Sequence, residues 1–292
     1  MFAITAITGK VGGVVASTLL AAGCGVRAVV RDAAKGAPWR ALGCEVAVAD
    51  LADAGQLARA LEGIEGAFIL LPPVFDPQPD FTDVRATIAA IREALAQARP
   101  RKTVVLSTIG ADADQPNLLS ALRFLEQALA DLDLPITFLR AGWFMENAEW
   151  DMASARERGI ITSYLQPLDR PVPMVSIQDV GRVAAELLCE RWSGQRIVEL
   201  EAAERTTPNA IAAAFAEALG KPVRAQIAPR AEWEQAFRAQ GMKNPTPRMQ
   251  MIDGFNEGWI DFKPAGANSR KGRVTVDEAI AALVAVEAKK QV

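Results

Sequence analysis

The first 31 residues constrain the fold of this chain more than any other segment. A short apolar run at residues 2–5 leads into a glycine-containing turn at residues 8–13. A run of small and apolar residues with helical character follows at residues 14–22, and a second apolar run, Val26–Val30, ends at Arg31. Strand, glycine turn, helix and strand in this order form the first βαβ unit of a dinucleotide-binding sheet. The segment therefore predicts an α/β fold of the Rossmann type.

The glycine turn and the residue after the second strand also predict a cofactor. Glycines let the backbone approach a pyrophosphate, and the free N–H groups at the start of the next helix bind it. We expect this contact from Thr8, Gly9, Lys10, Val11 and Gly12. An acid after the second strand binds a ribose 2′-hydroxyl, whereas Arg31 suits a 2′-phosphate, which favours NADP(H). A turn without a ligand, and a solvated Arg31 beside Asp32, are the alternatives.

Strand-like and helix-like segments alternate through the N-terminal half. The strand-like runs lie at residues 44–49, 67–71, 103–107 and 136–139, and the helix-like runs at residues 54–61, 83–98 and 118–132. The run at 67–71 is continuously apolar, as expected of a strand buried on both faces of a parallel sheet. This alternation predicts right-handed crossovers and a doubly wound parallel sheet.

Ligands of such sheets bind outside the carboxyl ends of the strands, which selects further candidate residues. Besides the glycine turn and Arg31, the cofactor candidates are Asp50, Leu51, Leu71, Pro72 and Ser107. Asp50 suits an adenine amino group, although a loop acid also caps helices. Ser107 suits the nicotinamide end, although a serine there is also a common turn residue. The sequence leaves both alternatives open.

The alternation ends near residue 141, which indicates a second region. Helix-like segments follow at residues 176–188, 208–219, 233–240 and 277–286, and the segment 253–262 carries Phe255 and Trp259. We therefore expect an NADP-binding Rossmann domain at residues 1–150 and a smaller, mostly helical substrate-binding lobe at residues 151–292. The boundary is approximate, and the chain is free to cross between the lobes.

The residue types that are absent exclude several kinds of catalysis. The chain has no histidine, which excludes Ser-His-Asp and Cys-His catalysis and the usual histidine metal sites. Its single tyrosine, Tyr164, is followed four positions later by Leu168, so the Tyr-x-x-x-Lys pair of short-chain dehydrogenases is missing. We assign no metal ligand and no catalytic residue, and a reductase of this sequence would take its proton from water, the substrate or another side chain.

Charge and cysteine usage bear on partners and location. The formal net charge is −3 and no basic run is present, which argues against nucleic acid as a primary partner. Cys24, Cys44 and Cys189 lack CxxC spacing, which fits a reducing compartment. The apolar run at residues 11–22 resembles an export signal, but the residues before Lys10 carry no charged side chain, Lys10 interrupts the apolar run, and the run leads into Arg31 and a continuing fold. We expect a cytoplasmic protein without a membrane span.

Residues 139–147, Leu-Arg-Ala-Gly-Trp-Phe-Met-Glu-Asn, resemble the L-R-P-G-W-F-x-E-N signature of NmrA-like proteins, which are atypical short-chain dehydrogenases. Further matches to that family are the turn at 8–12, Arg31, the prolines at 72 and 73, Ser107, and the segments 175–180 and 255–262. The family includes NADPH-dependent quinone and dye reductases, and NADPH-sensing regulators without turnover. The loop at 72–76 also resembles ergot-alkaloid reductases of the same group.

The resemblance implies a substrate pocket formed by Pro73, Phe75, Trp143, Phe144 and Asn147. The last three follow a strand end, so we expect them over the nicotinamide, where aromatic faces hold a flat conjugated acceptor. Burial of the two aromatic residues between lobes is the alternative.

Four positions in this chain depart from the family pattern. Ala6 replaces the first glycine of the turn and Ala141 replaces the signature proline. Arg123 stands where many relatives have lysine, and Leu119 stands at the place of the missing tyrosine. Without the tyrosine and lysine at these last two positions, alcohol oxidation is in doubt. The reaction that stays open is hydride transfer to an activated acceptor.

Two functions of different classes follow. The first is an NADPH-dependent oxidoreductase that transfers hydride to a quinone, enone or iminium. The second is an NADPH-sensing protein that acts through a protein partner without turnover. An epimerase or lyase is less favoured, because it would need a Tyr/Lys pair or a histidine. The acceptor, the hydride face and the oligomeric state stay open.

Overall fold

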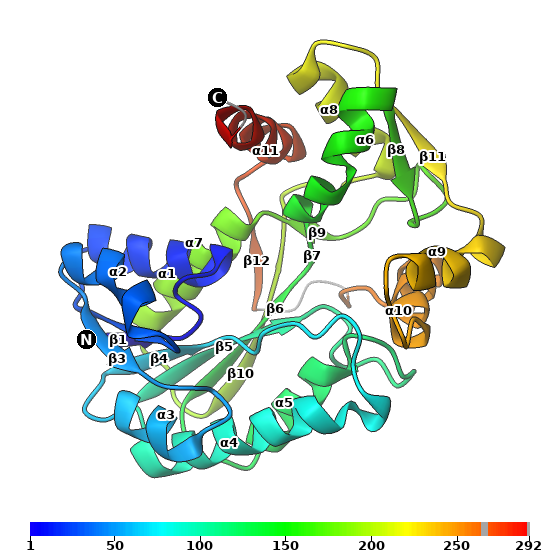
Figure 1. Ribbon diagram of the computed structural model, residues 1–292. Coiled ribbons are helices and arrows are strands. Elements are labelled where there is room, and N and C mark those ends of the chain that lie inside the picture. The colour runs from blue at the N-terminus through cyan, green and yellow to red at the C-terminus, as the bar shows by residue number, and fades with distance from the viewer. Residues whose placement is uncertain (264–267, 291–292) are drawn as a thin grey trace. The chain divides into compact units, whose positions relative to one another are not determined.

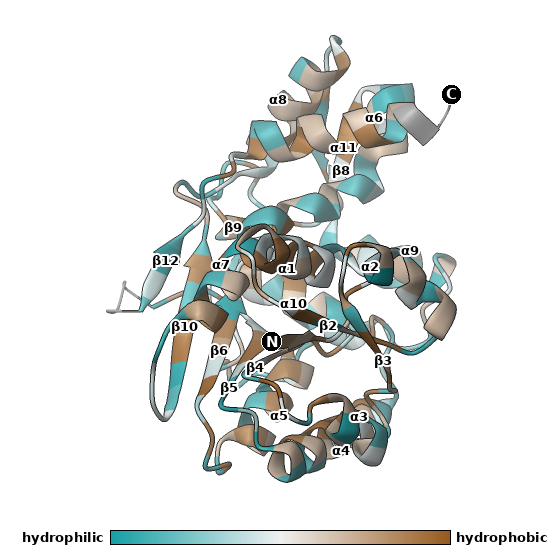
Figure 2. Cartoon of the chain, turned by 90° about the vertical axis from the view of Figure 1, so that its left-hand side faces the viewer, coloured by the Kyte–Doolittle hydropathy of each residue, from teal (hydrophilic) through white to brown (hydrophobic). Residues whose placement is uncertain are grey.

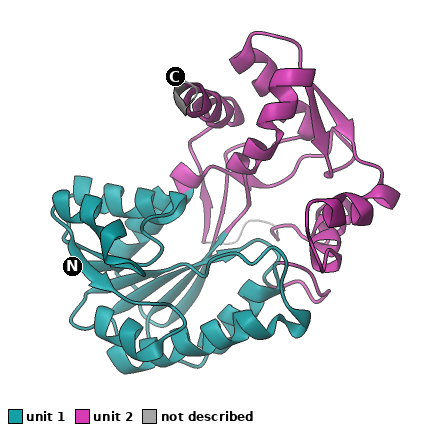
Figure 3. Ribbon diagram, in the orientation of Figure 1, with its two compact units in different colours: residues 1–111, 119–140, 180–198 teal, residues 112–118, 141–179, 199–292 magenta. Residues whose placement is uncertain are grey.

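A computed structural model describes residues 1–263 and 268–290, the last two as backbone alone. The chain divides into two compact units (Figure 3). Unit 1 comprises Met1–Ala111, Leu119–Arg140 and Val180–Val198, and unit 2 comprises Asp112–Leu118, Ala141–Asp179 and Glu199–Val292. The chain thus crosses between the two units several times.

The main sheet of the described residues has eight strands in the order β12-β10-β6-β5-β4-β1-β2-β3. These strands are β1 (Phe2–Ile4), β2 (Val26–Val30), β3 (Glu45–Val48), β4 (Gly66–Ile69), β5 (Lys102–Thr108), β6 (Ile136–Ala141), β10 (Gln195–Glu201) and β12 (Ser269–Lys271). β1 pairs in parallel with β2 and with β4, so that Phe2 lies opposite Val26 on one side and Gly66 on the other. The strand order reverses at β1, where a doubly wound sheet binds its ligands.

Helices cover both faces of the sheet in unit 1, which confirms the doubly wound α/β fold (Figure 1). The helices α1 (Lys10–Ala21), α2 (Ala37–Ala41) and α7 (Ile177–Cys189) lie on one face. The helices α3 (Ala54–Ala60), α4 (Thr82–Ala98) and α5 (Ser120–Leu129) lie on the other. Gly181 of α7 allows the close approach to α1, because a Cβ there would lie 2.5 Å from Cβ of Val14.

Apolar residues at helical spacing form the core between the sheet and α3, α4 and α5. In α4, Ile88, Ile91 and Leu95 recur every three or four residues and are buried. All four residues of β4 are buried, as expected of a strand covered on both faces. Hydrophobic residues, brown in Figure 2, accordingly gather on the strands of this unit.

Unit 2 contains strands as well as helices. The helices are α6 (Met152–Arg158), α8 (Pro208–Leu219), α9 (Trp233–Ala239), α10 (Thr246–Glu257) and α11 (Val276–Lys290). Two short parallel pairs, β8 (Ile160–Ser163) with β11 (Arg224–Ile227) and β7 (Trp143–Phe144) with β9 (Met174–Val175), accompany them. Phe215 of α8 and Ile280 of α11 are fully buried in one core cluster. No described helix has both the length and the apolar character needed to cross a membrane.

The strand β10 and the helix α10 were not predicted from the sequence. β10 extends the main sheet although the alternation of strands and helices ends near residue 141. The segment 253–262 divides between the end of α10 and the turn that follows it.

Candidate cofactor and substrate site

The glycine turn is built on close backbone approaches. A Cβ at Gly12 would lie 2.3 Å from the carbonyl oxygen of Ala6, so only glycine fits where α1 meets the turn. Gly9 has an extended backbone (φ −89°), and a Cβ there would lie 3.2 Å from the same oxygen. The fold therefore requires glycine at position 12. At the exposed position 9, the lack of a side chain mainly leaves the space beside the turn open.

Ala6 adopts a backbone conformation that favours glycine. Its φ is +48°, in the left-handed region that L-residues with a Cβ rarely enter. The position at which the family pattern has its first glycine thus has a backbone conformation that suits glycine, although alanine occupies it. The departure at Ala6 is a local strain, not a different turn.

The N-terminus of α1 fits an anion. The N-cap residue, Gly9, supplies no side-chain cap to the helix. Thr8, Gly9 and Lys10 are exposed, whereas Val11 and Gly12 are buried. An uncapped helix start offers backbone N–H groups and the positive end of the helix dipole. The residues present therefore fit the pyrophosphate of a dinucleotide.

Arg31 is the first residue after β2, on the strand next to β1. It is exposed and forms no hydrogen bond or ion pair with any described residue. The carboxylate of Asp32 accepts a hydrogen bond from the Ala34 N–H at 2.9 Å and makes no ion pair with Arg31. Binding of a phosphate by Arg31 stays a prediction.

Asp50 is exposed after β3, and its carboxylate accepts a hydrogen bond from the N–H of Ala52 at 2.9 Å. The cap of α3 is Asp53, which accepts from the N–H of Gln56 at 2.9 Å. The capping role considered for Asp50 is therefore performed by Asp53. Leu51 beside it is half-buried.

The ends of β1 and β4 are joined by Thr5, which the sequence analysis did not select. Its hydroxyl donates to the carbonyl oxygen of Phe68 and accepts from the N–H of Leu70, both at 3.0 Å. After these residues Leu71 is buried, whereas Pro72, Pro73 and Phe75 are exposed. The only sequence signal for Thr5 is its place at the end of the first strand.

Ser107 belongs to a buried polar cluster of unit 1. It lies within β5 and is 3% exposed, and its hydroxyl donates to Glu126 at 2.5 Å. Arg140, at the end of β6, donates to both oxygens of Glu126 at 2.9 and 2.7 Å. The hydroxyl of Ser107 is thus positioned by a charged partner, Glu126. The sequence analysis did not select Glu126, because this residue of α5 belongs to no recognisable motif.

The substrate candidates of the signature lie in unit 2. Trp143 and Phe144 form β7 and are half-buried, as is Asn147. The Trp143 ring meets Phe255 edge-on, with centroids 5.2 Å apart. Packing within unit 2 therefore accounts for part of the burial of Trp143. Pro73 and Phe75 belong to unit 1.

Two acids of the family motifs have structural partners. Glu146 accepts from the Ser176 hydroxyl at 2.6 Å and from the Ile177 N–H at 3.0 Å, at the start of α7. Asp179 is buried and accepts from the N–H groups of Arg273 and Val274 at 2.7 and 2.8 Å. These acids position backbone segments of unit 2.

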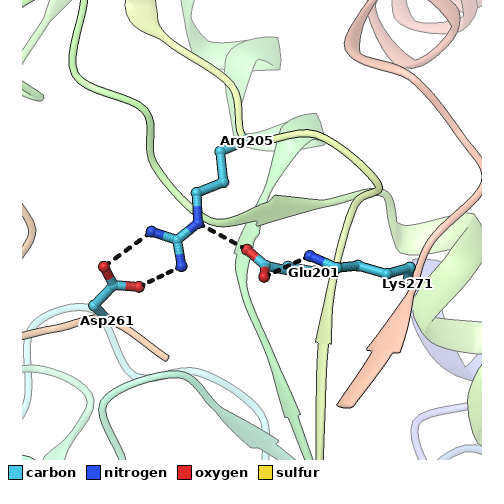
Figure 4. Close-up of polar contacts among 4 residues, drawn as sticks. All are labelled: Glu201, Arg205, Asp261 and Lys271. Atoms are coloured by element: carbon cyan, nitrogen blue, oxygen red, sulfur yellow. Dashed lines mark hydrogen bonds and ion pairs between the residues drawn. The ribbon is translucent and has the colours of Figure 1, made fainter. Parts of the chain in front are cut away.

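An ion-pair network joins the segment after α10 to two strands of unit 2 (Figure 4). Arg205 donates to both carboxylate oxygens of Asp261, at 2.9 and 2.7 Å, and to Glu201 at 3.1 Å. Lys271 of β12 pairs with the other oxygen of Glu201 at 2.7 Å. Asp261 belongs to the segment 255–262 that matches the family pattern, and these ion pairs give it a structural role as well.

The remaining candidates for acid–base or metal chemistry are few. Tyr164 packs in unit 2 against Phe237, with ring centroids 4.9 Å apart, and edge-on against Trp233. Arg123 and Leu119 are half-buried near the start of α5. No group of three His, Cys, Asp or Glu residues in the described ranges could hold a metal ion.

Comparisons with known proteins place this chain among reductases of similar size. The model of the NmrA-like family matches residues 2–258. The chain is 28% identical to NAD(P)H azoreductase of Xenophilus azovorans over 261 residues, which is 88% of this chain and 85% of that protein. It is 27% identical to quinone oxidoreductase 2 of Escherichia coli over 245 residues, or 83% and 82% of the two chains.

Solved structures show the same fold. The NADPH complex of an NADPH-dependent quinone oxidoreductase from E. coli matches with a TM-score of 0.81 and 24% identity, over 97% of this chain and 99% of that one. The NADP(H) complex of triphenylmethane reductase from Citrobacter sp. matches with a TM-score of 0.80 and 20% identity, over 97% and 99%. At these identities the likeness concerns the fold.

Proposed function

Because the chain belongs to the NmrA-like family, we propose that it is an NADP(H)-dependent reductase. Its substrate would be a flat conjugated electrophile: a quinone, an enone or an iminium. The observation that carries the proposal is Arg31, an exposed cation without a partner in the described chain, placed on the strand beside the glycine turn. Its relatives named azoreductase and quinone oxidoreductase support the reaction class.

In this proposal the residues of unit 1 bind the cofactor. Thr8, Gly9, Lys10, Val11 and Gly12 hold the pyrophosphate through the uncapped start of α1. Arg31 binds the 2′-phosphate, and Asp50 accepts from the adenine amino group. Leu51, Leu71 and Pro72 supply apolar contacts. The Ser107 hydroxyl donates a hydrogen bond to Glu126, so its oxygen can accept a hydrogen bond from the ligand.

When bound, NADPH supplies the hydride, and the protein orients the acceptor and excludes water. For a quinone the balance is quinone plus NADPH plus one proton, giving hydroquinone and NADP⁺. That one proton comes from solvent in this proposal, because the chain has no Tyr-x-x-x-Lys pair and no histidine. Such acceptors need little help from a general acid.

The acceptor would stack on aromatic side chains. We propose Trp143, Phe144 and Asn147 of unit 2 as its contacts. For Pro73 and Phe75 of unit 1, contact with the substrate stays a prediction from the sequence. We also propose that the protein works in the cytoplasm, on the composition argument from the sequence. A protein partner belongs to the alternative proposal of an NADPH sensor.

The test is steady-state NADPH oxidation with a panel of quinones, alongside titration of NADPH binding. We expect saturable turnover with at least one quinone, and a clear preference for NADPH over NADH. Tight NADPH binding without oxidation by any acceptor would instead support the sensor. Absence of NADPH binding would contradict both functions.

A further inference from the structure

The side chain of Arg248 is unusual in its surroundings. It projects from α10, which packs against α9 (Figure 1). Its guanidinium lies 4.5 Å from the ring centroid of Phe237 and 5.5 Å from that of Trp150. Its one hydrogen bond to a described residue is the weak contact of Nη1 with Sδ of Met242 at 3.7 Å. All four residues belong to unit 2.

Two other arginines of unit 2, Arg205 and Arg230, have carboxylate partners. Arg205 is paired with Glu201 and Asp261, and Arg230 donates to both oxygens of Asp253 at 2.7 Å. Within the described ranges Arg248 meets no carboxylate, although it is half-buried. A guanidinium carries five N–H donors, so most of those on Arg248 lack a protein acceptor there.

This arrangement leaves a desolvation cost uncompensated. Burial lowers the pKa of the Arg248 guanidinium, and only the nearby Tyr164 opposes this effect. Two aromatic faces offset part of the cost through cation–π attraction. An anionic ligand would offset more, because a charge-assisted hydrogen bond is about twice as strong as a neutral one.

The neighbouring ring is suited to an aromatic ligand. Trp150 is 60% exposed and lies at the end of the 3-10 helix Met145–Asp151, just after the signature segment. An exposed indole beside an unpaired guanidinium offers a stacking face and a bidentate anion donor together.

We propose that Arg248 and Trp150 recognise an acceptor that carries an anionic group, a sulfonate or carboxylate, on an aromatic ring. This inference rests on the proposed reductase function and names the substrate class of the same protein. Arg248 binds the anion and Trp150 stacks on the ring, so anionic acceptors have lower KM values than their uncharged counterparts.

The experiment compares 1,4-naphthoquinone-2-sulfonate with 2-methyl-1,4-naphthoquinone as acceptors for NADPH oxidation. Arg248→Met removes the charge and keeps an unbranched apolar chain. We expect its KM for the sulfonate to rise about 10- to 100-fold and its KM for the uncharged quinone to stay within about twofold. Arg248→Lys should fall between, because it keeps the charge and loses the planar fork.

The matched control is Arg230→Met, which removes an arginine whose charge Asp253 already neutralises. It should leave the ratio of the two KM values unchanged. Equal losses for both quinones in a folded Arg248→Met variant would overturn the proposal, since packing alone would then explain Arg248. If both Arg248 variants misfold, inhibition of the wild type decides: naphthalene-2-sulfonate should compete with the quinone, and its failure to do so overturns the proposal.

Direct binding separates this inference from the proposed reductase function. Naphthalene-2-sulfonate, which is not reduced, should quench tryptophan fluorescence of the wild type and do so far more weakly with Arg248→Met. Binding of this kind without NADPH oxidation would keep the anion site and reject the reductase. Turnover without discrimination between the two quinones would keep the reductase and reject the anion site.

Discussion

At the scale of single residues, the cofactor cradle depends on stereochemistry at a few backbone positions. Gly12 cannot carry a Cβ, which would lie 2.3 Å from the Ala6 carbonyl oxygen. Ala6, in contrast, carries one at a positive φ. The two positions therefore respond in opposite directions to an exchange between glycine and alanine.

Ala6→Gly should stabilise the protein. The substitution relieves the left-handed backbone strain at φ +48°, which stabilises the folded state. It also increases the entropy of the unfolded chain, which offsets part of this gain. Strain of this kind costs about 1–3 kcal/mol and the added glycine entropy opposes the gain by about 0.4–1 kcal/mol, so we expect a net gain of up to about 2.5 kcal/mol. Urea denaturation measures it, and a midpoint lower than that of the wild type would contradict the strain. Gly12→Ala should shift the midpoint down.

Arg31→Glu should weaken NADPH binding much more than NADH binding. A charge-assisted contact to the 2′-phosphate is worth about 1.5–3 kcal/mol, which corresponds to about 10- to 100-fold in Kd. Titrations with both cofactors measure the ratio. Equal losses for the two would mean that Arg31 does not bind the 2′-phosphate. Asp32→Asn is the neighbouring control, since Asp32 bonds to the Ala34 N–H.

At the scale of elements, buried polar groups connect strands and helices that are distant in sequence. Ser107, Glu126 and Arg140 join β5, α5 and β6 within unit 1. Thr5 joins the ends of β1 and β4. These contacts hold the carboxyl edge of the sheet, where the cofactor candidates lie.

Glu126→Gln should destabilise the protein, because it removes the negative charge that Glu126 places 2.7 Å from the buried Arg140 guanidinium. Breaking one partner of such a pair costs about 3–5 kcal/mol. Thermal unfolding measures the loss. The double variant Glu126→Gln with Arg140→Met should recover part of it, since the second change also removes the buried guanidinium that Glu126 balanced. A double variant less stable than Glu126→Gln would contradict this account.

Asp151, where the 3-10 helix Met145–Asp151 meets α6, should make stability depend on pH. Burial raises the pKa of its carboxyl to about 6, although a hydrogen bond from the Thr162 backbone opposes this. Because the folded pKa exceeds the unfolded one, the folded state binds the proton more tightly. This group therefore lowers stability as pH rises from about 4 to about 6, by at most about 3 kcal/mol.

Asp151→Asn removes this titration and keeps a side-chain oxygen for the Thr162 N–H. It should raise the Tm at pH 7.5 and leave the Tm nearly unchanged at pH 3.5. A Tm difference that does not vary with pH would show that Asp151 does not titrate between the two values.

At the scale of the whole molecule, the residue types that the chain lacks bear on its chemistry. Reductases usually take their proton from a tyrosine or a histidine. Because this chain has no histidine and a single tyrosine, Tyr164 is the one residue of these two types that it offers. Its ring packs against Phe237 and Trp233 in unit 2. The ring, which phenylalanine also has, accounts for these contacts.

Tyr164→Phe should leave quinone reduction within about twofold of the wild type. A hydroxyl that acts as a general acid contributes about a hundredfold or more to the rate. Steady-state kcat with a quinone measures this, with unchanged circular dichroism as the control. A hundredfold loss would identify Tyr164 as the proton donor and contradict solvent as the source.

The α/β class, the early strands and helices, and the place of the glycine turn were predictable from the sequence. Helical periodicity, continuous apolar runs and the stereochemistry of glycine are local properties, so a linear sequence records them. Arg31 was also selected in this way, because its place after the second strand follows from the order of elements. Its role toward the cofactor stays a prediction.

Only the tertiary structure decided which distant residues meet. It joined Glu126 to Ser107 and Arg140, which lie 19 and 14 positions away, and Asp179 to the backbone at Arg273 and Val274. It also placed β10 in the main sheet and left Arg248 among aromatic rings with no carboxylate of a described residue as its partner. Strand pairing and the burial of charge depend on contacts between segments far apart in the chain, and no local pattern encodes them.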